Sequence, residues 1–500
     1  TNTANISEVT FGDVWYCGGQ SNMALPMSHT FSRNFTAANI TAGKYSNVRL
    51  FGMSGNMNPT MGWIPARDAV NDSHPDKSVL FTFSSTCWYY AEGLTNELGS
   101  EAPPIGLIHT AWGGSMIEQW LPNTTLATCK SAGQSSANEE WWTSRILPFV
   151  NMSIKGWLWY QGENNMHEPF GAAIGGYGCM LPALIKLWRS TWSVEPGTTD
   201  PNAPFGLVFI PGSGSEGGPS MGYMRNSQSA NYGILPNAEM PNTFSAQIYD
   251  LDDPVENLDC YHVGCCAFAP KPHPAGYCTA CQPLCDSWVG TPVYMGPIHP
   301  RSKYHVGMRL GRAAAVTVYG SSGHSQGPTL EGCTKSSNEV VIDFQSTNTI
   351  DSLAPIKPGG QMMQVLVNMS DWCMQQSGNT CEDDGTGHNS SAEGFDSPTV
   401  WVDVNFTLTS STSVTVDLTN TNGTAFGVRY GWYGSCCAKV VPAPNTAEAD
   451  YCALESCQIM GLESRFAANG FQVSANTITT IIATTTTTTT TATTTTATAA

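Results

Sequence analysis

The first 320 residues alternate between short apolar runs and longer segments in which apolar positions recur with helical spacing. Short apolar runs bounded by glycine are typical of buried strands. Such runs occupy 14–17, 48–51, 105–109, 155–160 and 205–210. Helical spacing is found at 87–94, 181–192 and 304–319. Strands that alternate with helices predict an α/β fold with a parallel sheet flanked by helices on both faces.

Three of the predicted strands end in glycine-rich loops that carry polar groups. The first loop bears Ser21, the second bears a Gly-Gly pair at 113–114, and the third bears the pattern Gly162-x-Asn164. The carboxyl ends of parallel strands meet at one edge of a sheet, where open α/β folds bind their ligands. We therefore expect these three loops to lie close together.

After residue 320 the helical spacing disappears, and short alternating strands follow one another between polar loops. Such a pattern predicts a smaller β-sandwich-like domain. We expect an α/β domain over 1–324, a β-rich domain over 325–475 and a tail over 476–500. The tail is almost wholly Thr and Ala from residue 484 onward, and such a tract buries too little apolar surface to fold.

The charge and the cysteine content narrow the possible partners and compartments. The net charge of −18 and the lack of a Lys/Arg stripe argue against a nucleic-acid partner. No apolar run approaches the length of about 20 residues that a transmembrane helix needs. The 17 cysteines and ten N-x-S/T sequons favour a secreted or lysosomal, luminal protein with disulfides and attached glycans. The chain begins at Thr1, and we expect a mature form or a fragment.

Six of the cysteines fall within an insertion at 254–296 that is also rich in Pro and Gly. We expect it to be stapled by disulfides, because the other signals indicate an oxidising compartment. The alternative is a zinc site, since Cys278 and Cys281 have ligand spacing and His262 and His273 lie nearby. The total of 17 is odd, so at least one thiol is free or pairs outside this chain.

Ser21 is a candidate nucleophile, because it follows a predicted buried strand and a Gly-Gly turn. A serine nucleophile needs a base. The best candidate is His299, in a loop directly before the predicted helix at 304–319. His109 stands at a strand end and is a candidate for lining the same site. On their own, these residue types are also common in turns and on surfaces.

The motif Gly19-Gln20-Ser21-Asn22-Met23, preceded by Phe-Gly-Asp-Val-Trp at 11–15, resembles the first block of the sialate O-acetylesterases, which are SGNH-type hydrolases. Further blocks match in the same order at 105–120, 159–163 and 298–310, with additional fits at 240–244 and 428–432. The resemblance spans about residues 8–320. It implies an SGNH-type fold for the 1–324 domain, a serine esterase activity on O-acetylated sialoglycans, and no metal ion or cofactor.

The resemblance also implies roles for individual residues. Ser21 would attack the acetyl carbonyl, and His299 would accept the serine proton. The oxyanion donors would be the Ser21 N–H, Gly114 (less favoured, Gly113) and either Asn164 or Asn165, of which the Gly-x-Asn pattern favours Asn164. Further residues of the matching blocks are candidates for the substrate site: Gln20, Gln161, Glu163 and Asn165.

Three points stay open at this stage. Many relatives carry an Asp two or three residues before the histidine, but Gly296 and Pro297 stand here, so the group that orients His299 is either a backbone carbonyl or one of Asp250, Asp252 and Asp253. The substrate could also be another acetylated glycan, such as xylan. A different class of function is an inactive carbohydrate-binding glycoprotein, against which the presence of both Ser21 and His299 argues.

Overall fold

The computed structural model describes most of the α/β region and the strands of the C-terminal region. The described residues are 9–52, 62–70, 78–129, 139–166, 176–194, 198–212, 220–253, 295–296, 298–336, 338–348, 350–356, 362–368, 399–421, 425–432, 438–439, 452–453, 457–463 and 467–474. The cysteine-rich segment up to residue 294 and the tail after residue 474 lie outside them, so the disulfide, zinc and tail predictions stay predictions.

A seven-stranded sheet forms the centre of the first region, with the order β3-β2-β4-β1-β5-β6-β7. Its strands are β1 (Asp13–Gly19), β2 (Val48–Gly52), β3 (Ile64–Pro65), β4 (Ile105–His109), β5 (Gly156–Tyr160), β6 (Phe205–Val208) and β7 (Thr243–Ala246). All neighbouring strands pair in parallel except β2 and β3, which are antiparallel. The first strand in the chain is thus the central strand of the sheet.

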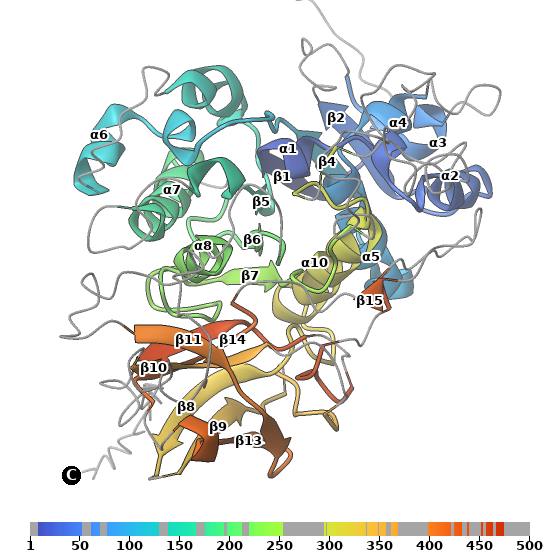
Figure 1. Cartoon of the computed structure of the whole chain (residues 1–500). Coiled ribbons are helices and arrows are strands. Elements are labelled where there is room, and N and C mark those ends of the chain that lie inside the picture. The colour runs from blue at the N-terminus through green and yellow to red at the C-terminus, as the bar shows by residue number, and fades with distance from the viewer. Residues whose placement is uncertain are drawn as a thin grey trace, which may run out of the picture.

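Helices cover both faces of this sheet (Figure 1). The helices are α1 (Ser21–Ala24), α2 (Arg33–Thr41), α3 (Ala66–Ala69), α4 (Val79–Thr82), α5 (Ser85–Leu98), α6 (Asn123–Leu126), α7 (Tyr177–Trp192), α8 (Ser220–Gln228) and α10 (Lys303–Thr317). Single turns of 3-10 helix occur at Met27–His29, Gly99–Glu101, Ile117–Trp120, Ala127–Cys129, Leu147–Phe149, Glu163–Asn165 and Thr419–Thr421, and a π-helical turn at Trp142–Ile146.

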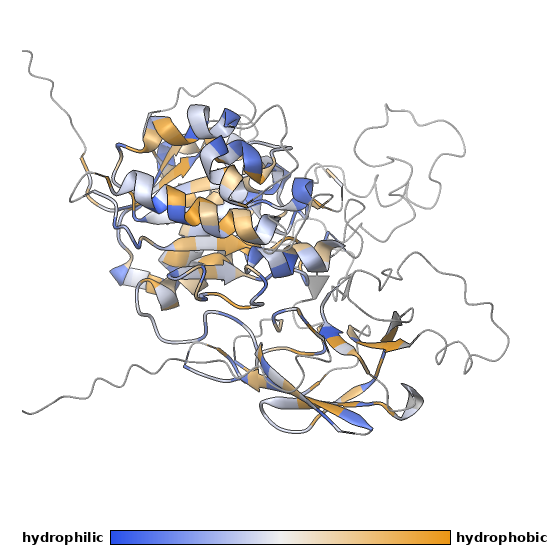
Figure 2. Ribbon diagram, turned by 90° about the vertical axis from the view of Figure 1, so that its left-hand side faces the viewer, coloured by the Kyte–Doolittle hydropathy of each residue, from blue (hydrophilic) through white to orange (hydrophobic). Residues whose placement is uncertain are grey.

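Alternation along β1 explains the two covered faces. Trp15 and Cys17 lie in one hydrophobic core with the buried sides of α5 and α10, whereas Tyr16 lies in the other core with α7 and α8. Successive side chains of a strand point to opposite faces. Hydrophobic, orange segments lie in the inner strands of the α/β region and on parts of the helices around them (Figure 2). The predicted α/β architecture is therefore confirmed.

Close packing of α5 against α10 fixes the segment that precedes α10. A Cβ added at Gly307 would lie only 2.2 Å from Cβ of Tyr89, so the two helices can approach this closely only with glycine there. The Cys17–Cys87 disulfide joins β1 to α5, and a second disulfide joins Cys129 to Cys179. Strand β1, α5 and α10 are thus held together as one unit.

The C-terminal region contains two four-stranded antiparallel sheets, with the orders β11-β10-β14-β17 and β12-β13-β9-β8. Their strands are β8 (Thr329–Lys335), β9 (Glu339–Gln345), β10 (Met363–Asn368), β11 (Thr399–Asp403), β12 (Phe406–Leu408), β13 (Ser413–Asp417), β14 (Gly427–Tyr430) and β17 (Phe471–Ser474), and β15 (Ala438–Lys439) pairs with β16 (Cys452–Ala453). Side chains from both sheets share one core, which includes Ile342, Val365 and Val428. The sandwich-like arrangement is as predicted.

The two regions are in contact through polar and aromatic side chains. Arg225 of α8, which is 5% exposed, donates hydrogen bonds to the carbonyls of Gly431 and Trp432. The Tyr249 hydroxyl donates to the Ala468 carbonyl at 2.7 Å. Both contacts lie on the side of β6 and β7, and the C-terminal sheets therefore pack below that end of the α/β sheet (Figure 1). The boundary at 324/325 stays a prediction.

Candidate active site

Ser21 lies at the carboxyl end of the central strand, as the first residue of α1. Gly19, at the end of β1, has a φ of +131°, and a Cβ there would lie 2.2 Å from the Tyr160 carbonyl oxygen. Only glycine fits this close approach between β1 and β5. The strand therefore ends in a tight turn that brings the half-buried Ser21 to the sheet edge.

His299 reaches Ser21 from a segment 278 residues further along the chain. Its Nε2 lies 2.8 Å from Oγ of Ser21. Its Nδ1 lies 2.9 Å from the Met295 carbonyl oxygen, which can only accept. Nδ1 therefore carries the proton, and Nε2 is the acceptor for the serine hydroxyl. The structure brings together the two residues that the sequence selected as nucleophile and base.

The three aspartates that the sequence left open as partners of His299 are occupied elsewhere. Asp250 pairs with Arg309 at 2.6 Å, Asp253 pairs with Arg301 at 2.7 Å, and Asp252 accepts from the Gly212 N–H at 3.3 Å. Arg301 follows His299 by two residues, and both side chains of the Arg301–Asp253 pair are almost fully buried. The carboxylate of Asp253 braces the loop that carries His299, because it accepts from the N–H and the guanidinium of Arg301, while the group facing Nδ1 is the Met295 carbonyl.

The environment of His299 favours a neutral imidazole. Burial lowers its pKa to about 4, and the positive charge of Lys303 acts in the same direction. The hydrogen bond to the Met295 carbonyl opposes this effect, and His29 adds a further lowering contribution. A neutral ring at mildly acidic pH is the form that can accept a proton from Ser21.

The second loop lies beside Ser21. A Cβ added at Gly113 would be 3.7 Å from Cβ of Ser21, which is ordinary van der Waals contact. Gly114 follows with a φ of +73°, and its carbonyl accepts a hydrogen bond from Nδ2 of Asn164 at 2.7 Å. Asn164 is exposed and uses one of its two amide hydrogens in this contact. The second hydrogen remains available to a ligand oxygen.

Asn165 has a different environment, which distinguishes the two asparagines. It is fully buried, its Oδ1 accepts from the Ile117 N–H and from Gln161, and its Nδ2 donates to Glu118 at 2.9 Å. All of its polar atoms are engaged inside the protein. Asn164 lies at the surface next to Gly114. This position is consistent with Asn164, rather than Asn165, as the oxyanion donor that the Gly-x-Asn pattern favours.

The side chains expected to contact substrate form a buried layer beneath the pair. Gln20, Gln161, Glu163 and Asn165 are each 3% exposed or less. Oε1 of Gln20 accepts from Gln161 at 3.0 Å and from the Asn164 N–H at 3.2 Å. In the described structure these side chains lie within the protein, and their contact with substrate stays a prediction. Polar side chains in a glycine-rich loop suggest exposure, but here they satisfy one another and fix the loops.

Two buried residues near the pair received no role from the sequence. Asn22 donates hydrogen bonds to Glu163 and, at 2.7 Å, to the Ile298 carbonyl. Lys303, which is fully buried, donates to Oδ1 of Asn22 at 2.7 Å and to the Pro300 carbonyl. Both residues lie within the sequence blocks that resemble the sialate O-acetylesterases. This position in the sequence was the signal that could have pointed to them.

His109 does not take part in these contacts. It is fully buried at the end of β4, and its ring packs edge-on against Phe83 with 5.6 Å between the ring centroids. Burial lowers its pKa to about 3. The candidate for lining the site is thus packed in the interior, where it remains neutral.

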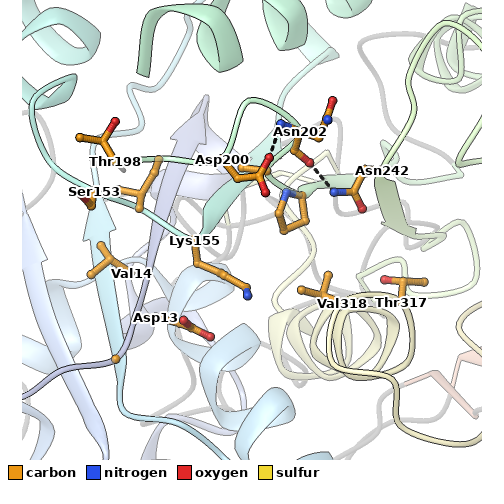
Figure 3. A pocket seen from close by; sticks show the side chains of 14 residues that line it. Asp13, Val14, Ser153, Lys155, Thr198, Asp200, Asn202, Asn242, Thr317 and Val318 are labelled. Atoms are coloured by element: carbon orange, nitrogen blue, oxygen red, sulfur yellow. Dashed lines mark hydrogen bonds between the residues drawn. The ribbon is translucent and has the colours of Figure 1, made fainter. Parts of the chain in front are cut away.

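The opposite edge of the sheet also has a cavity, of about 460 Å³. It is lined at the amino ends of β1, β5 and β6, and the side chains of Asp13, Lys155, Asp200, Asn202 and Asn242 surround it (Figure 3). None of the predicted catalytic residues lines this cavity. Across the described part of the chain, no cluster of three or more His, Cys, Asp or Glu side chains could hold a metal ion, and no helix is long and apolar enough to cross a bilayer.

Comparison with protein families relates this site to a known class. Residues 11–196 match the model of a family described as carbohydrate esterase, sialic acid-specific acetylesterase. Over these residues the chain is similar to this family. The matched residues include Ser21, Gly114 and Asn164, whereas His299 lies beyond them.

Curated relatives agree with this assignment. The chain is 32% identical over 340 residues to the sialate O-acetylesterase of Pongo abelii, which covers 64% of this chain and 55% of the relative. It is 31% identical over 344 residues to the human sialate O-acetylesterase, with the same shares. The chain thus spans about half the length of the curated relatives it matches.

A solved structure shows the same fold. The crystal structure of a carbohydrate acetylesterase from Xanthomonas citri superimposes with a TM-score of 0.58 and 19% identity, covering 92% of this chain and 80% of that chain. At this identity the similarity concerns the arrangement of the elements. It extends across the region of the seven-stranded sheet into the antiparallel sheets.

Proposed function

We propose that the chain is a serine esterase that removes O-acetyl groups from carbohydrates, and that O-acetylated sialic acids are its substrates. The observation that carries the proposal is the contact of 2.8 Å between Oγ of Ser21 and Nε2 of His299, with Nδ1 held by a carbonyl. A nucleophile within hydrogen-bond reach of an oriented base is the arrangement that activates serine. The family and its curated relatives support the choice of an acetyl ester and of sialic acid.

The reaction follows from the protonation state of His299. Ser21 Oγ attacks the acetyl carbonyl carbon as its proton moves to Nε2, and a tetrahedral intermediate forms. The C–O bond to the sugar then breaks, and the imidazolium returns the proton to the leaving sugar oxygen. Water, deprotonated by the same Nε2, attacks the acetyl-serine, and the imidazolium returns this proton to Oγ of Ser21 as acetate is released. The Met295 carbonyl stabilises the imidazolium through Nδ1–H.

The negative oxygen of the tetrahedral intermediate needs hydrogen-bond donors. We assign this role to the Ser21 N–H, the Gly114 N–H and Nδ2 of Asn164. As the first residue of α1, Ser21 has no acceptor for its N–H within the helix. Gly114 and Asn164 are joined by their own hydrogen bond, so their donors belong to one rigid unit.

We further propose that the enzyme acts in a secreted or lysosomal setting. Support comes from the two disulfides between described cysteines and from the ten sequons of the sequence. The protein should then gain N-glycans when expressed with a secretion signal in eukaryotic cells. A lack of any mobility change after enzymatic removal of N-glycans would contradict this setting.

The decisive experiment measures acetate release by the purified chain. Wild type and Ser21→Ala are incubated with 9-O-acetylated sialic acid and, in parallel, with acetyl-xylan. We expect release from the sialic acid with wild type alone. Preferential release of acetate from acetyl-xylan would make xylan, and not sialic acid, the substrate. No release from any acetylated sugar would favour the carbohydrate-binding alternative.

A further inference from the structure

The two peptide carbonyls on either side of His299 are each held by a buried side chain. Nδ2 of Asn22 donates to the carbonyl of Ile298, the residue before His299. Nζ of Lys303 donates to the carbonyl of Pro300, the residue after it. Asn22 and Lys303 are also joined to each other at 2.7 Å. The backbone at the base is therefore clamped on both sides by one hydrogen-bonded pair.

The same pair is connected to the nucleophile and to the third loop. Asn22 is the residue next to Ser21, and its amide donates to Glu163, which is the residue next to Asn164. The clamp thus joins the three segments that hold nucleophile, base and oxyanion donor. A change of its geometry moves Ser21 and His299 relative to each other.

Lys303 is the unusual member, because lysine is almost never fully buried unless its charge is balanced. Its ammonium lies 5.6 Å from the centre of the Tyr160 ring. Burial lowers its pKa to about 7, while the negative charges of Glu163 and Asp253 favour the protonated form. Asp253 is itself paired with Arg301, so Glu163 is the acidic group of the clamp.

We propose that Lys303 is a positioning residue of this esterase, which together with Asn22 and Glu163 fixes His299 against Ser21 and supplies positive charge beside the imidazole. The inference rests on the proposed function, for which it names the residue that sets the alignment of the catalytic pair. The groups that face His299 are Lys303 on α10, His29 on the turn Met27–His29, and the Met295 carbonyl. Among the charged groups, Lys303 lowers the pKa of His299 more than His29 does.

The test is Lys303→Met, which keeps most of the length of the side chain and removes its charge and its donors. We expect kcat to fall by about 100-fold, the effect of a misplacement of about 1 Å, with an unchanged KM. The acid limb of the pH profile should move upward by about one pH unit, because loss of a nearby positive charge favours the imidazolium. Unchanged turnover and an unchanged limb would overturn the proposal.

Lys303→Met also leaves the carboxylate of Glu163 buried without its cation, which is destabilising. The double variant Lys303→Met/Glu163→Gln removes both charges and should recover thermal stability. Turnover should stay low, because the donor to the Pro300 carbonyl is still missing. Recovery of turnover together with stability would reduce Lys303 to a structural role and overturn the proposal.

Lys155→Met is the matched control, since Lys155 is a half-buried lysine of the same sheet at its opposite edge (Figure 3). It changes the net charge equally and should leave kcat and the pH limb unchanged. An equal effect of Lys155→Met would show that net charge alone is responsible, contrary to the proposal.

Labelling of Ser21 by a fluorophosphonate separates this inference from the choice of substrate. The probe phosphonylates an activated serine and releases fluoride, whatever ester the enzyme naturally cleaves. If Lys303→Met is labelled more slowly than wild type, and the acid limb of its labelling rate lies at a higher pH, the inference is supported even if no acetylated sugar is hydrolysed. Absence of labelling in wild type would overturn both proposals.

Discussion

The two edges of the seven-stranded sheet differ in what they offer a ligand. The amino edge has a cavity of about 460 Å³ lined by Asp13, Lys155 and Asp200, and these residues form no nucleophile–base pair. The carboxyl edge brings Ser21 and His299 to 2.8 Å over a buried polar layer. Room and polarity alone therefore do not define a catalytic site. What distinguishes the carboxyl edge is a pair of reactive atoms whose positions are fixed from several segments.

The largest effect should come from breaking the pair itself. Ser21→Ala and His299→Ala should each lower turnover by several orders of magnitude, and the double variant should lose little more, because the two residues act as one unit. Acetate release by the folded variants measures this. If the two losses multiply, the paired roles are wrong.

The next effect concerns the oxyanion donors and separates the two asparagines. Asn164→Ala should lower kcat by about 100- to 1000-fold, as the loss of one such donor does, with little change in melting temperature. Asn165→Ala should instead destabilise the fold by about 1–3 kcal/mol, because Glu118 and Gln161 lose a buried partner. If Asn165→Ala instead lost turnover and Asn164→Ala lost stability, Asn165 would be the oxyanion donor.

The pH profile tests the electrostatics of the carboxyl edge. The base must be unprotonated to accept the serine proton, and the pKa of His299 is lowered to about 4. We expect kcat/KM to rise with pH through about 4 and to be flat from about 5 to 7. An acid limb near the ordinary histidine value of about 6.5 would contradict the described environment.

Asp253, which braces the His299 loop through Arg301, should affect stability more than turnover. Asp253→Asn should destabilise the fold by about 3–5 kcal/mol, because Arg301 remains buried without its counter-charge. The folded fraction should keep its turnover within about tenfold of wild type, or about 1.4 kcal/mol of barrier, since a carbonyl orients His299. A thousandfold loss in a folded Asp250, Asp252 or Asp253 variant would assign the orienting role to that carboxylate.

The smallest effect should be found at the amino edge. Asp200→Asn removes an exposed carboxylate that accepts from the Asn202 N–H at 2.7 Å. Turnover should be unchanged, and the free energy of unfolding should change by about 0.5 kcal/mol or less. A marked loss of activity would show that the two edges are coupled.

The sequence was sufficient for the elements and for the proximity of Ser21 and His299. Apolar periodicity located the strand before Ser21 and the helix after His299, because burial on both faces of a sheet imposes that pattern. It was insufficient for the group that orients His299, since a backbone carbonyl such as that of Met295 is present in every residue and leaves no signature. It was also insufficient for the burial of the four polar side chains Gln20, Gln161, Glu163 and Asn165, because partners distant in the chain decide whether a polar group is buried.

The separation of 278 residues between the nucleophile and its base has a consequence for biosynthesis. Ribosomes add about 5–20 residues per second, so roughly 14–56 s pass between the synthesis of Ser21 and that of His299. During this interval the growing chain contains the nucleophile without its base. Under the proposed mechanism, hydrolytic competence would therefore appear only after nearly the whole α/β region has been made and α10 has docked against α5.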